Sequence, residues 1–304
     1  MNCYRANGKL LLTGEYLVLK GALALALPLG FGQSLTVRHC EQSEAMTKWN
    51  AHRPFGRPWF SATFDKDFKV LATDDTTKAQ RLSNILKAVH KLNPSAFNQS
   101  LHFETCLDFD PEWGLGSSST LISNLAQWAN VNPYKLLNMT FGGSGYDIAC
   151  ATAETPIFYQ LNNGKPQVSP VAFNPKFADQ LYFIYQGQKQ QSSKEVKSFN
   201  QRMLEYDFHD DLESISEISR KLPAISTLAE FRQCIDTHEA ILARCLDREP
   251  VKAHFLDFEG SLKSLGAWGG DFLLAATDLP YKEVLAYFNE KGLSTIFKYQ
   301  DLIL

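Results

Sequence analysis

A loop rich in glycine and serine constrains the fold of this 304-residue chain more than any other segment. Before it, residues 100–109 alternate apolar and polar side chains, and after it residues 117–130 carry apolar side chains at helical spacing. Proline and two glycines cannot continue a strand, so the sequence predicts a strand, a tight turn and a helix in succession. The loop reads Pro111-Glu112-Trp113-Gly114-Leu115-Gly116-Ser117-Ser118-Ser119.

The same loop has the composition of an anion-binding site. Its glycines allow the backbone to approach a ligand closely, and its three serine hydroxyls lie beside the free N–H groups of the helix start. A helix N-terminus carries roughly +0.5 of a charge, which suits polyphosphate. The loop is not a Walker A motif, because no Gly-Lys-Ser/Thr ends it. A glycine turn followed by serine N-caps is the alternative interpretation of this local pattern.

Three further segments carry candidate chemistry. Residues 142–149 place three glycines in four residues before a single carboxylate, Asp147, which alone fits a helix cap as well as a catalytic group. Residues 263–271 form a second glycine-rich turn that leads into an expected strand. Residues 6–9 and 14–16 supply Lys9 and a Gly-Glu-Tyr sequence, although a lone lysine early in a strand is usually a solvated edge charge.

Composition excludes several classes of protein. The net charge of -3 argues against a constitutive nucleic-acid binder, whose phosphate contacts need a clustered basic surface. With 44% hydrophobic residues the chain can bury a full core, so wholesale disorder is excluded. The apolar stretch 21–37 is interrupted by proline and glycine and falls short of a membrane span. We therefore expect no nucleic-acid partner and no membrane partner.

The cysteines and histidines bear on compartment and metal content. Six cysteines lie far apart, with no Cys-x-x-Cys pair and no signal peptide ahead of them, which predicts a reduced, cytoplasmic compartment. The seven histidines include no His-Glu-x-x-His motif, so a tightly held transition metal has no support.

The pattern along the chain predicts two α+β halves. The turn-forming cluster at 162–166 marks the expected boundary, which gives domains of residues 1–165 and 166–304. We expect helices at 76–92, 117–130, just after 146, within 193–244 and at 281–289. Expected strands cover 4–12, 16–19, 22–27, 34–40, 59–64, 100–109, 156–161, 181–185, 272–276 and 294–299.

The four segments occur in the order seen in the GHMP small-molecule kinases, and the resemblance spans almost the whole chain. The Pro-x-x-Gly-Leu-Gly-Ser-Ser-Ser loop is quite specific for that superfamily. The resemblance implies a two-domain GHMP kinase fold with an N-terminal mixed β/α domain and a C-terminal ferredoxin-like α+β domain. It also implies an enzyme that uses ATP and Mg2+ to phosphorylate a small molecule.

Within the superfamily the sequence most resembles the mevalonate branch. The spellings Gly-Glu-Tyr-Leu-Val-Leu at 14–19 and Gly-Ser-Gly-Tyr-Asp-Ile-Ala at 143–149 are similar to those of phosphomevalonate kinases. Residues 187–193 resemble a small-residue substrate loop of those enzymes. Mevalonate or phosphomevalonate is therefore the acceptor that the resemblance implies, with the protein a monomer or a homodimer.

The resemblance also implies residue roles. Asp147 would lie against the acceptor oxygen with Lys9 beside it, and Ser118 would reach Mg2+. The acceptor contacts would come from Glu15, Tyr16, Gly145 and Ser193. ATP would lie in a cleft between the halves, with its binding residues in the loop and in the late glycine turn: Gly114, Leu115, Gly116, Ser117, Ser118, Ser119, Gly266, Gly269 and Gly270.

The sequence departs from the family at four positions. Leu136 stands where mevalonate kinase has a Mg2+-binding glutamate, so either Ser118 and the ATP oxygens hold the ion with water or the metal arrangement is altered. Trp113 and Trp268 are large for their loops, and Tyr16 replaces the histidine of mevalonate kinase. These departures leave two alternatives, a catalytically silent nucleotide- or metabolite-binding regulator and a diphosphomevalonate decarboxylase-like enzyme.

Overall fold

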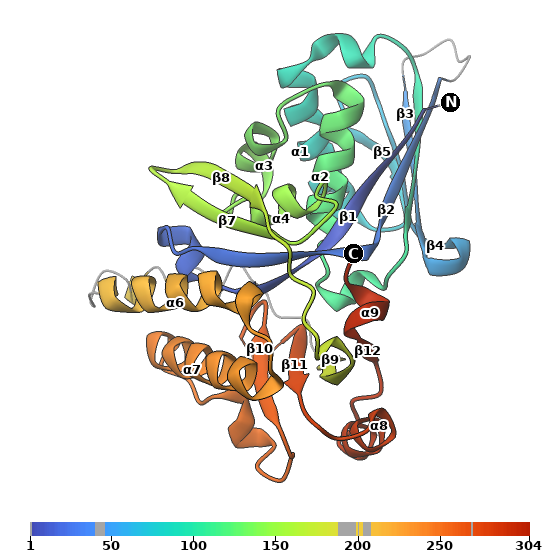
Figure 1. Cartoon of the computed structure of the whole chain (residues 1–304). Coiled ribbons are helices and arrows are strands. Elements are labelled where there is room, and N and C mark those ends of the chain that lie inside the picture. The colour runs from blue at the N-terminus through green and yellow to red at the C-terminus, as the bar shows by residue number, and fades with distance from the viewer. Residues whose placement is uncertain (1, 40–45, 188–198, 200, 203–207, 269) are drawn as a thin grey trace. The chain divides into compact units, whose positions relative to one another are not determined.

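The computed structural model describes residues 2–39, 46–187, 199, 201–202, 208–268 and 270–304 (Figure 1). The chain forms two compact units, each built from three separated segments. The first unit comprises residues 1–8, 31–111 and 116–152, and the second comprises residues 9–30, 112–115 and 153–304. Both contain sheets and helices, which confirms the expected α+β class.

The first unit is built on a mixed sheet. Its strands lie in the order β5-β4-β3-β6-β2, with β3 and β6 parallel and the other neighbours in this order antiparallel. β1 also pairs with β2, and these two strands continue into the second unit. The strand bounds are β1 Asn2–Thr13, β2 Ala24–His39, β3 Thr47–Arg53, β4 Arg57–Phe64, β5 Val70–Thr73 and β6 Leu101–Leu107.

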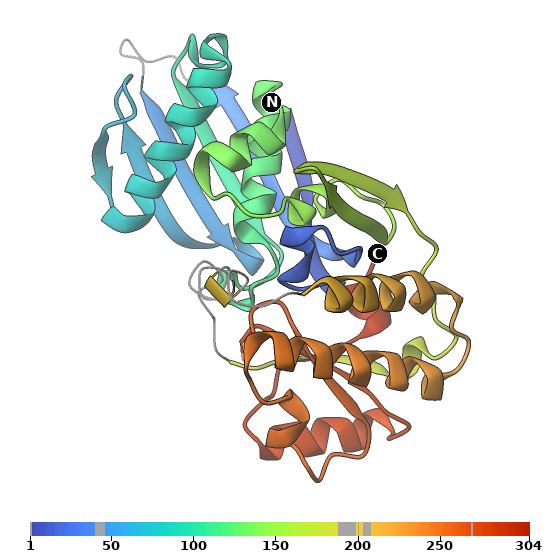
Figure 2. The ribbon, with the colours of Figure 1, turned by 90° about the vertical axis from the view of Figure 1, so that its left-hand side faces the viewer.

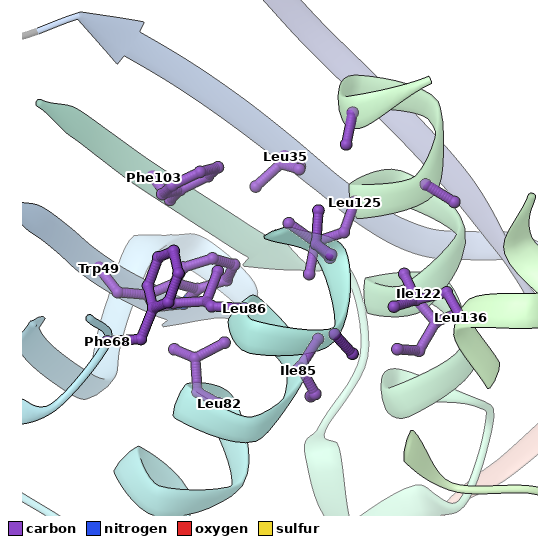
Figure 3. Close-up of a cluster of buried hydrophobic side chains, with 14 of the residues drawn as sticks. Leu35, Trp49, Phe68, Leu82, Ile85, Leu86, Phe103, Ile122, Leu125 and Leu136 are labelled. Atoms are coloured by element: carbon purple, nitrogen blue, oxygen red, sulfur yellow. The ribbon is translucent and has the colours of Figure 1, made fainter. Parts of the chain in front are cut away.

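Four α-helices complete the described part of the first unit. α1 begins after Asp75, whose side chain accepts a hydrogen bond from the Lys78 N–H group at 2.9 Å, and its buried apolar residues recur at helical spacing. Those residues enter a core that also contains Trp49 and Phe103, whose rings stack 5.0 Å apart (Figure 3). The bounds are α1 Thr76–Leu92, α2 Ser117–Ala129, α3 Pro133–Thr140 and α4 Tyr146–Cys150.

The second unit has its own antiparallel sheet, in the order β10-β11-β9-β12. β7 and β8 form a hairpin that pairs with residues 24–26 of β2. Helices α6 and α7 lie side by side, and α7 packs against β10 (Figure 2). The bounds are β7 Ile157–Asn162, β8 Lys165–Pro170, β9 Leu181–Tyr185, α6 His209–Lys221, α7 Leu228–Leu246, β10 Ser261–Leu265, β11 Phe272–Ala276, α8 Tyr281–Glu290, β12 Ile296–Lys298 and α9 Tyr299–Leu302.

Most expected elements are confirmed, and the exceptions have physical reasons. The strand expected at 16–19 is wrong: Leu17–Lys20 is a 3-10 helix, because Gly14 and Gly21 turn the backbone with φ of 91° and 95°. The strands expected at 22–27 and 34–40 belong to one strand, β2. Pro28 is tolerated there because it lies between residues 24–26, which pair with β7, and residues 33–39, which pair with β6.

The sequence patterns missed several elements. β3, β5, β8, β10 and α3 were not expected, and the strand expected at 294–299 ends in the short helix α9. Helices α6 and α7 confirm part of the helical expectation for 193–244, whose beginning lies outside the described residues. The turn at 162–166 joins β7 to β8 inside the second unit, so the division into domains of residues 1–165 and 166–304 stays a prediction about folding units.

Candidate functional site

The glycine-serine loop forms the tight turn that its sequence predicts. Gly114 and Gly116 have φ of 70° and 102°, in the left-handed region that favours glycine. Gly116 is the N-cap of α2, so no side chain caps the helix, and its carbonyl accepts the Thr120 N–H at 2.9 Å. The N–H groups of residues 117–119 lie in the first turn of α2, where backbone donors have no acceptor within the helix. The helix start therefore has the geometry of an anion site.

The three serines of the loop differ in what their side chains do. Ser118 is exposed, so its hydroxyl can reach a ligand. Ser119 is 2% exposed, and its hydroxyl donates to the Gly116 carbonyl at 2.9 Å. The side chain of Ser119 thus stabilises the turn. Leu115 is fully buried, so only its backbone can contact a ligand.

Asp147 lies in helix α4, which packs against α2 in the first unit. The N-cap of α4 is Gly145, with φ of 86°, so the interpretation of Asp147 as the cap is wrong. Its Oδ1 accepts a hydrogen bond from the Ile148 N–H at 3.0 Å, and its side chain is half-buried. Burial raises the pKa of Tyr134, and the negative charge of Asp147 raises it further. A carboxylate therefore lies on the helix beside the proposed anion-binding helix.

Lys9 contacts the loop within the second unit. Its ammonium group donates to the Gly114 carbonyl at 2.9 Å, and its backbone N–H donates to the Leu115 carbonyl at 3.0 Å. Lys9 is half-buried, so the interpretation as a solvated edge charge does not hold. The segment at 6–9 thus meets the glycine-serine loop through Lys9.

The late glycine turn also meets the loop within the second unit. Gly266 has φ of 81°, and the carboxylate of Asp271 contacts both this residue and Gly114. A Cβ atom added to Gly114 would lie 2.7 Å from Asp271 Oδ2, and one added to Gly266 would lie 2.9 Å from the same oxygen. Both positions therefore require glycine on steric as well as conformational grounds.

Within the second unit, four ionisable side chains form a buried group: Glu15, His238, Glu239 and Lys263. Lys263 on β10 forms an ion pair with Glu15, at 2.5 Å between Nζ and Oε1. His238 Nε2 accepts the Gly14 N–H at 2.9 Å, which assigns the ring proton to Nδ1. Glu239 accepts hydrogen bonds from the Ser264 N–H and hydroxyl at 3.1 and 3.0 Å.

Burial governs the protonation of this group. It raises the pKa of Glu15 to about 7 even though the Lys263 charge opposes the shift, and it also raises the pKa of Glu239. Burial lowers the pKa of His238 well below its usual value, and the Lys263 charge acts in the same direction. The imidazole is therefore neutral at pH 7.

The two tryptophans of the glycine-rich segments, Trp113 and Trp268, contact other residues of the second unit. The backbone N–H of Trp268 donates to the Tyr16 hydroxyl at 2.7 Å. The Trp113 ring contacts the rings of Tyr185 and Phe297, with centroids 6.3 and 5.2 Å apart. Trp113 thus packs on the β9 and β12 edge of the second sheet, and Trp268 secures the late glycine turn to the Gly-Glu-Tyr segment.

The proposed site residues fall into two groups. The first unit holds Gly116, Ser117, Ser118, Ser119, Gly145 and Asp147, and the second holds Lys9, Glu15, Tyr16, Gly114, Leu115, Gly266 and Gly270. Gly269 and Ser193 lie outside the described residues.

Sequence reasoning gave no role to Lys263, His238, Glu239 or Asp271. The one available signal was a lysine within the otherwise uncharged strand Ser-Leu-Lys-Ser-Leu, a pattern that suggests a buried partner. Over the part of the chain that the structure describes, no group of three or more His, Cys, Asp or Glu residues could hold a metal ion. No described helix is both long and apolar enough to cross a bilayer.

Comparison with known proteins identifies the fold. No protein-family model matches the sequence, and no curated protein matches it. The structure is similar to a mevalonate kinase from Methanococcus jannaschii, at 14% identity and a TM-score of 0.70, over 97% of this chain and 96% of that one.

Two further structures have similar scores. A phosphomevalonate kinase from Streptococcus pneumoniae, in complex with phosphomevalonate and AMPPNP, matches at 17% identity and a TM-score of 0.70, over 98% and 100% of the two chains. A galactokinase from Lactococcus lactis, complexed with galactose, matches at 13% identity and 0.67, over 97% and 92%. At these identities the likeness shows the fold.

Proposed function

We propose that this chain, which has the fold of the GHMP small-molecule kinases, transfers the γ-phosphoryl group of ATP to a small-molecule acceptor. One observation carries the proposal: the glycine-capped start of α2 and the carboxylate of Asp147 lie on two helices that pack together. The first feature suits a triphosphate, and the second suits a hydroxyl group that must lose a proton.

In this proposal the loop from Gly114 to Ser119 binds the phosphates through backbone N–H groups. Gly114 and Gly116 have positive φ angles, and the backbone N–H groups in the first turn of α2 have no acceptor within the helix. Both features fit that role. The exposed Ser118 hydroxyl fits a magnesium ion carried by ATP, and that ion would neutralise charge on the phosphate oxygens. Leu136 is fully buried in α3, so this position supplies no metal ligand in place of the missing glutamate.

Asp147 would accept the proton of the acceptor hydroxyl. The oxygen then attacks the γ-phosphorus, the bond from that phosphorus to the bridging oxygen breaks, and ADP leaves. Lys9, through the Gly114 carbonyl, would hold the loop in place and would lend positive charge near the transferring group. If the acceptor is already a phosphate, no proton needs to move, and Asp147 would position the acceptor instead.

The acceptor we propose is mevalonate or phosphomevalonate. The spelling of the segments at 14–19 and 143–149 supports this choice. Structures of a mevalonate kinase and a phosphomevalonate kinase are among the similar ones, but so is a galactokinase, and the fold alone does not select among their acceptors.

The test is a coupled assay of ADP release with MgATP and a panel of mevalonate, phosphomevalonate, homoserine and galactose. We expect turnover with one of the first two compounds, and a rate about 10^2- to 10^4-fold lower with Asp147→Asn. Direct binding of AMPPNP without turnover on any acceptor would favour the silent regulator instead. Release of CO2 from diphosphomevalonate would favour the decarboxylase.

A pH profile of kcat separates the two roles of Asp147. A rate that falls as Asp147 becomes protonated supports proton transfer from a hydroxyl acceptor. A flat profile across the same range would support a phosphate acceptor and a positioning carboxylate.

A further inference from the structure

We propose that Asp271 is a positioning residue that fixes the backbone of the phosphate loop at Gly114. The proposal rests on the proposed function, since it concerns how the same loop binds nucleotide. Asp271 directly precedes β11, and its carboxylate lies against the Cα atoms of Gly114 and Gly266, one from each glycine-rich turn of the second unit.

Gly114 is held at two separate points. Its carbonyl accepts the hydrogen bond from the Lys9 ammonium group, and its Cα is covered by the Asp271 carboxylate. A glycine in the left-handed region has a broad choice of backbone angles, so without such contacts this peptide would be free to rotate. Because the Gly114 peptide leads directly into Gly116 and α2, its rotation would reorient the donors that face the phosphates.

Asp271 is itself well fixed. Its backbone carbonyl accepts the Gln186 N–H at 3.0 Å, and the Gln186 side chain donates to the Gly270 carbonyl. β11, which follows directly, is fully buried between β9 and β10. Asp271 also has a positive φ of 21°, a conformation that a non-glycine residue keeps only when its surroundings hold it there. Strand β11 thus fixes the position of the Asp271 carboxylate, and this carboxylate contacts the loop at Gly114.

The shape of the Asp271 side chain accounts for its fit against the two glycines. A carboxylate next to a phosphate-binding loop repels the triphosphate, so its negative charge does not favour binding. Its planar, branched shape fills the space that the missing side chains of Gly114 and Gly266 leave. Asparagine has the same shape without the charge, whereas alanine and glycine leave the space empty.

The primary test measures binding of magnesium-AMPPNP by titration calorimetry for the full chain and for Asp271→Asn, Asp271→Ala and Asp271→Gly. We expect the asparagine variant to bind within about threefold of the unaltered protein, and the two small variants to bind about 10- to 100-fold more weakly. The KM for the acceptor should change less than the KM for ATP in every variant. Unchanged binding in the small variants would overturn the proposal, as would an asparagine variant as weak as the alanine one, because that result assigns the role to charge.

Gly260→Ala is the matched control for general destabilisation. Gly260 also lies in the second unit, has a φ of 152°, and a Cβ there would meet the Ala276 carbonyl at 2.7 Å, away from the loop. This variant should lower the melting temperature and leave the AMPPNP affinity of the folded protein unchanged. If it weakens nucleotide binding as much as Asp271→Ala does, the loss reflects destabilisation and the proposal fails.

A reciprocal exchange tests the contact itself. Gly114→Ala should weaken AMPPNP binding both by its backbone conformation and by its clash with the carboxylate. In the double variant with Asp271→Gly the clash is gone, so binding should recover part of the loss. Additive losses would overturn the proposed contact.

The same measurements distinguish failure of this proposal from failure of the proposed function. If the unaltered protein binds no AMPPNP, the proposed function fails, and the role of Asp271 fails with it. If the unaltered protein binds AMPPNP and all three Asp271 variants bind it equally well, only the positioning role fails.

Discussion

Lys263 and Glu15 form a buried ion pair, with 2.5 Å between Nζ and Oε1 and side-chain exposures of 0% and 4%. The pair joins β10 to the Gly-Glu-Tyr segment inside the second unit. Because Glu15 is buried and engaged, we expect it to hold this segment in place, whereas the resemblance implied a contact with the acceptor. The Trp268–Tyr16 hydrogen bond makes a second link between the same two segments.

The ion pair predicts a cost for removing either partner. Glu15→Gln should lower the free energy of unfolding by about 3–5 kcal/mol, since it leaves the Lys263 charge buried without its partner. Lys263→Met should cost less, because burial raises the pKa of Glu15 and its carboxyl group can then fold with a proton bound. The double variant should cost less than the sum of the two. Urea unfolding of the four proteins measures this coupling, and additive losses would contradict it.

His238 predicts loss of stability in acid. Its pKa is lowered by burial, so below pH 6.5 the unfolded chain binds a proton that the folded chain does not. The free energy of unfolding should therefore fall as the pH drops below 6.5, by up to about 1.4 kcal/mol per pH unit from this group. In His238→Gln, which keeps an acceptor for the Gly14 N–H, the fall should be shallower.

Glu15 predicts a pH effect of the opposite sign. Its pKa is raised from 4.5 to about 7, so the folded chain holds a proton that the unfolded chain releases within this range. Its stabilising contribution is complete below pH 4.5 and is lost as the pH rises through about 7. Relative to Glu15→Gln, the unaltered protein should thus lose stability from pH 4.5 to 7. A difference that grows with pH would contradict the raised pKa.

The serines of the loop predict a separation between binding and stability. Ser118→Ala should raise the KM for ATP and leave the melting temperature unchanged, because the hydroxyl is exposed. Ser119→Ala should lower the stability by about 0.5–1.5 kcal/mol, because its hydroxyl bonds the Gly116 carbonyl. Thermal unfolding and initial-rate kinetics on both variants test this, and equal effects on both measurements would refute the assignment.

Asp147→Asn should lower kcat by about 10^2 to 10^4, the usual worth of a general base, and should leave ATP affinity nearly unchanged. The reason is that the amide keeps the size of the side chain but cannot accept the acceptor's proton. Rates with saturating ATP, together with AMPPNP binding, provide the measurement. Loss of nucleotide binding in this variant would move Asp147 out of the acceptor site.

Tyr16→Phe distinguishes a structural role from acceptor contact. The substitution removes the hydroxyl that accepts the Trp268 N–H, so stability should fall by about 1–3 kcal/mol. The KM for the acceptor should remain near that of the unaltered protein. A large rise in that KM with unchanged stability would restore the acceptor role that the resemblance implied.

Local sequence patterns predicted the helices and strands that neighbouring residues determine. The helix at 76–92 follows from the Asp75 cap and from apolar residues at helical spacing, and it was predicted with its observed bounds. Strands β9 and β11 were likewise predicted residue for residue, because each is a short apolar run bounded by polar or glycine-rich sequence. The glycine-serine loop was recognisable because Gly114 and Gly116 meet a local backbone requirement.

The remaining features depend on distant partners. Lys263 contacts Glu15 across 248 positions, and His238 contacts Gly14 across 224, so no window of sequence contains both members of either pair. The continuous strand β2 was missed for the same reason, since its partners β6 and β7 decide where Pro28 is tolerated. Asp271 was adjacent to a recognised motif, but its role follows only from its contact with Gly114.

The fluorescence of Trp113 can report on the conformation of the glycine-serine loop. The indole is directly bonded in sequence to Gly114 and packs against Tyr185 and Phe297, so any rearrangement of the loop alters the surroundings of its ring. Its emission, isolated by comparison with a Trp113→Phe protein, would report binding of the proposed nucleotide without an attached dye. This side chain thus makes the chain suited to rapid-mixing kinetics.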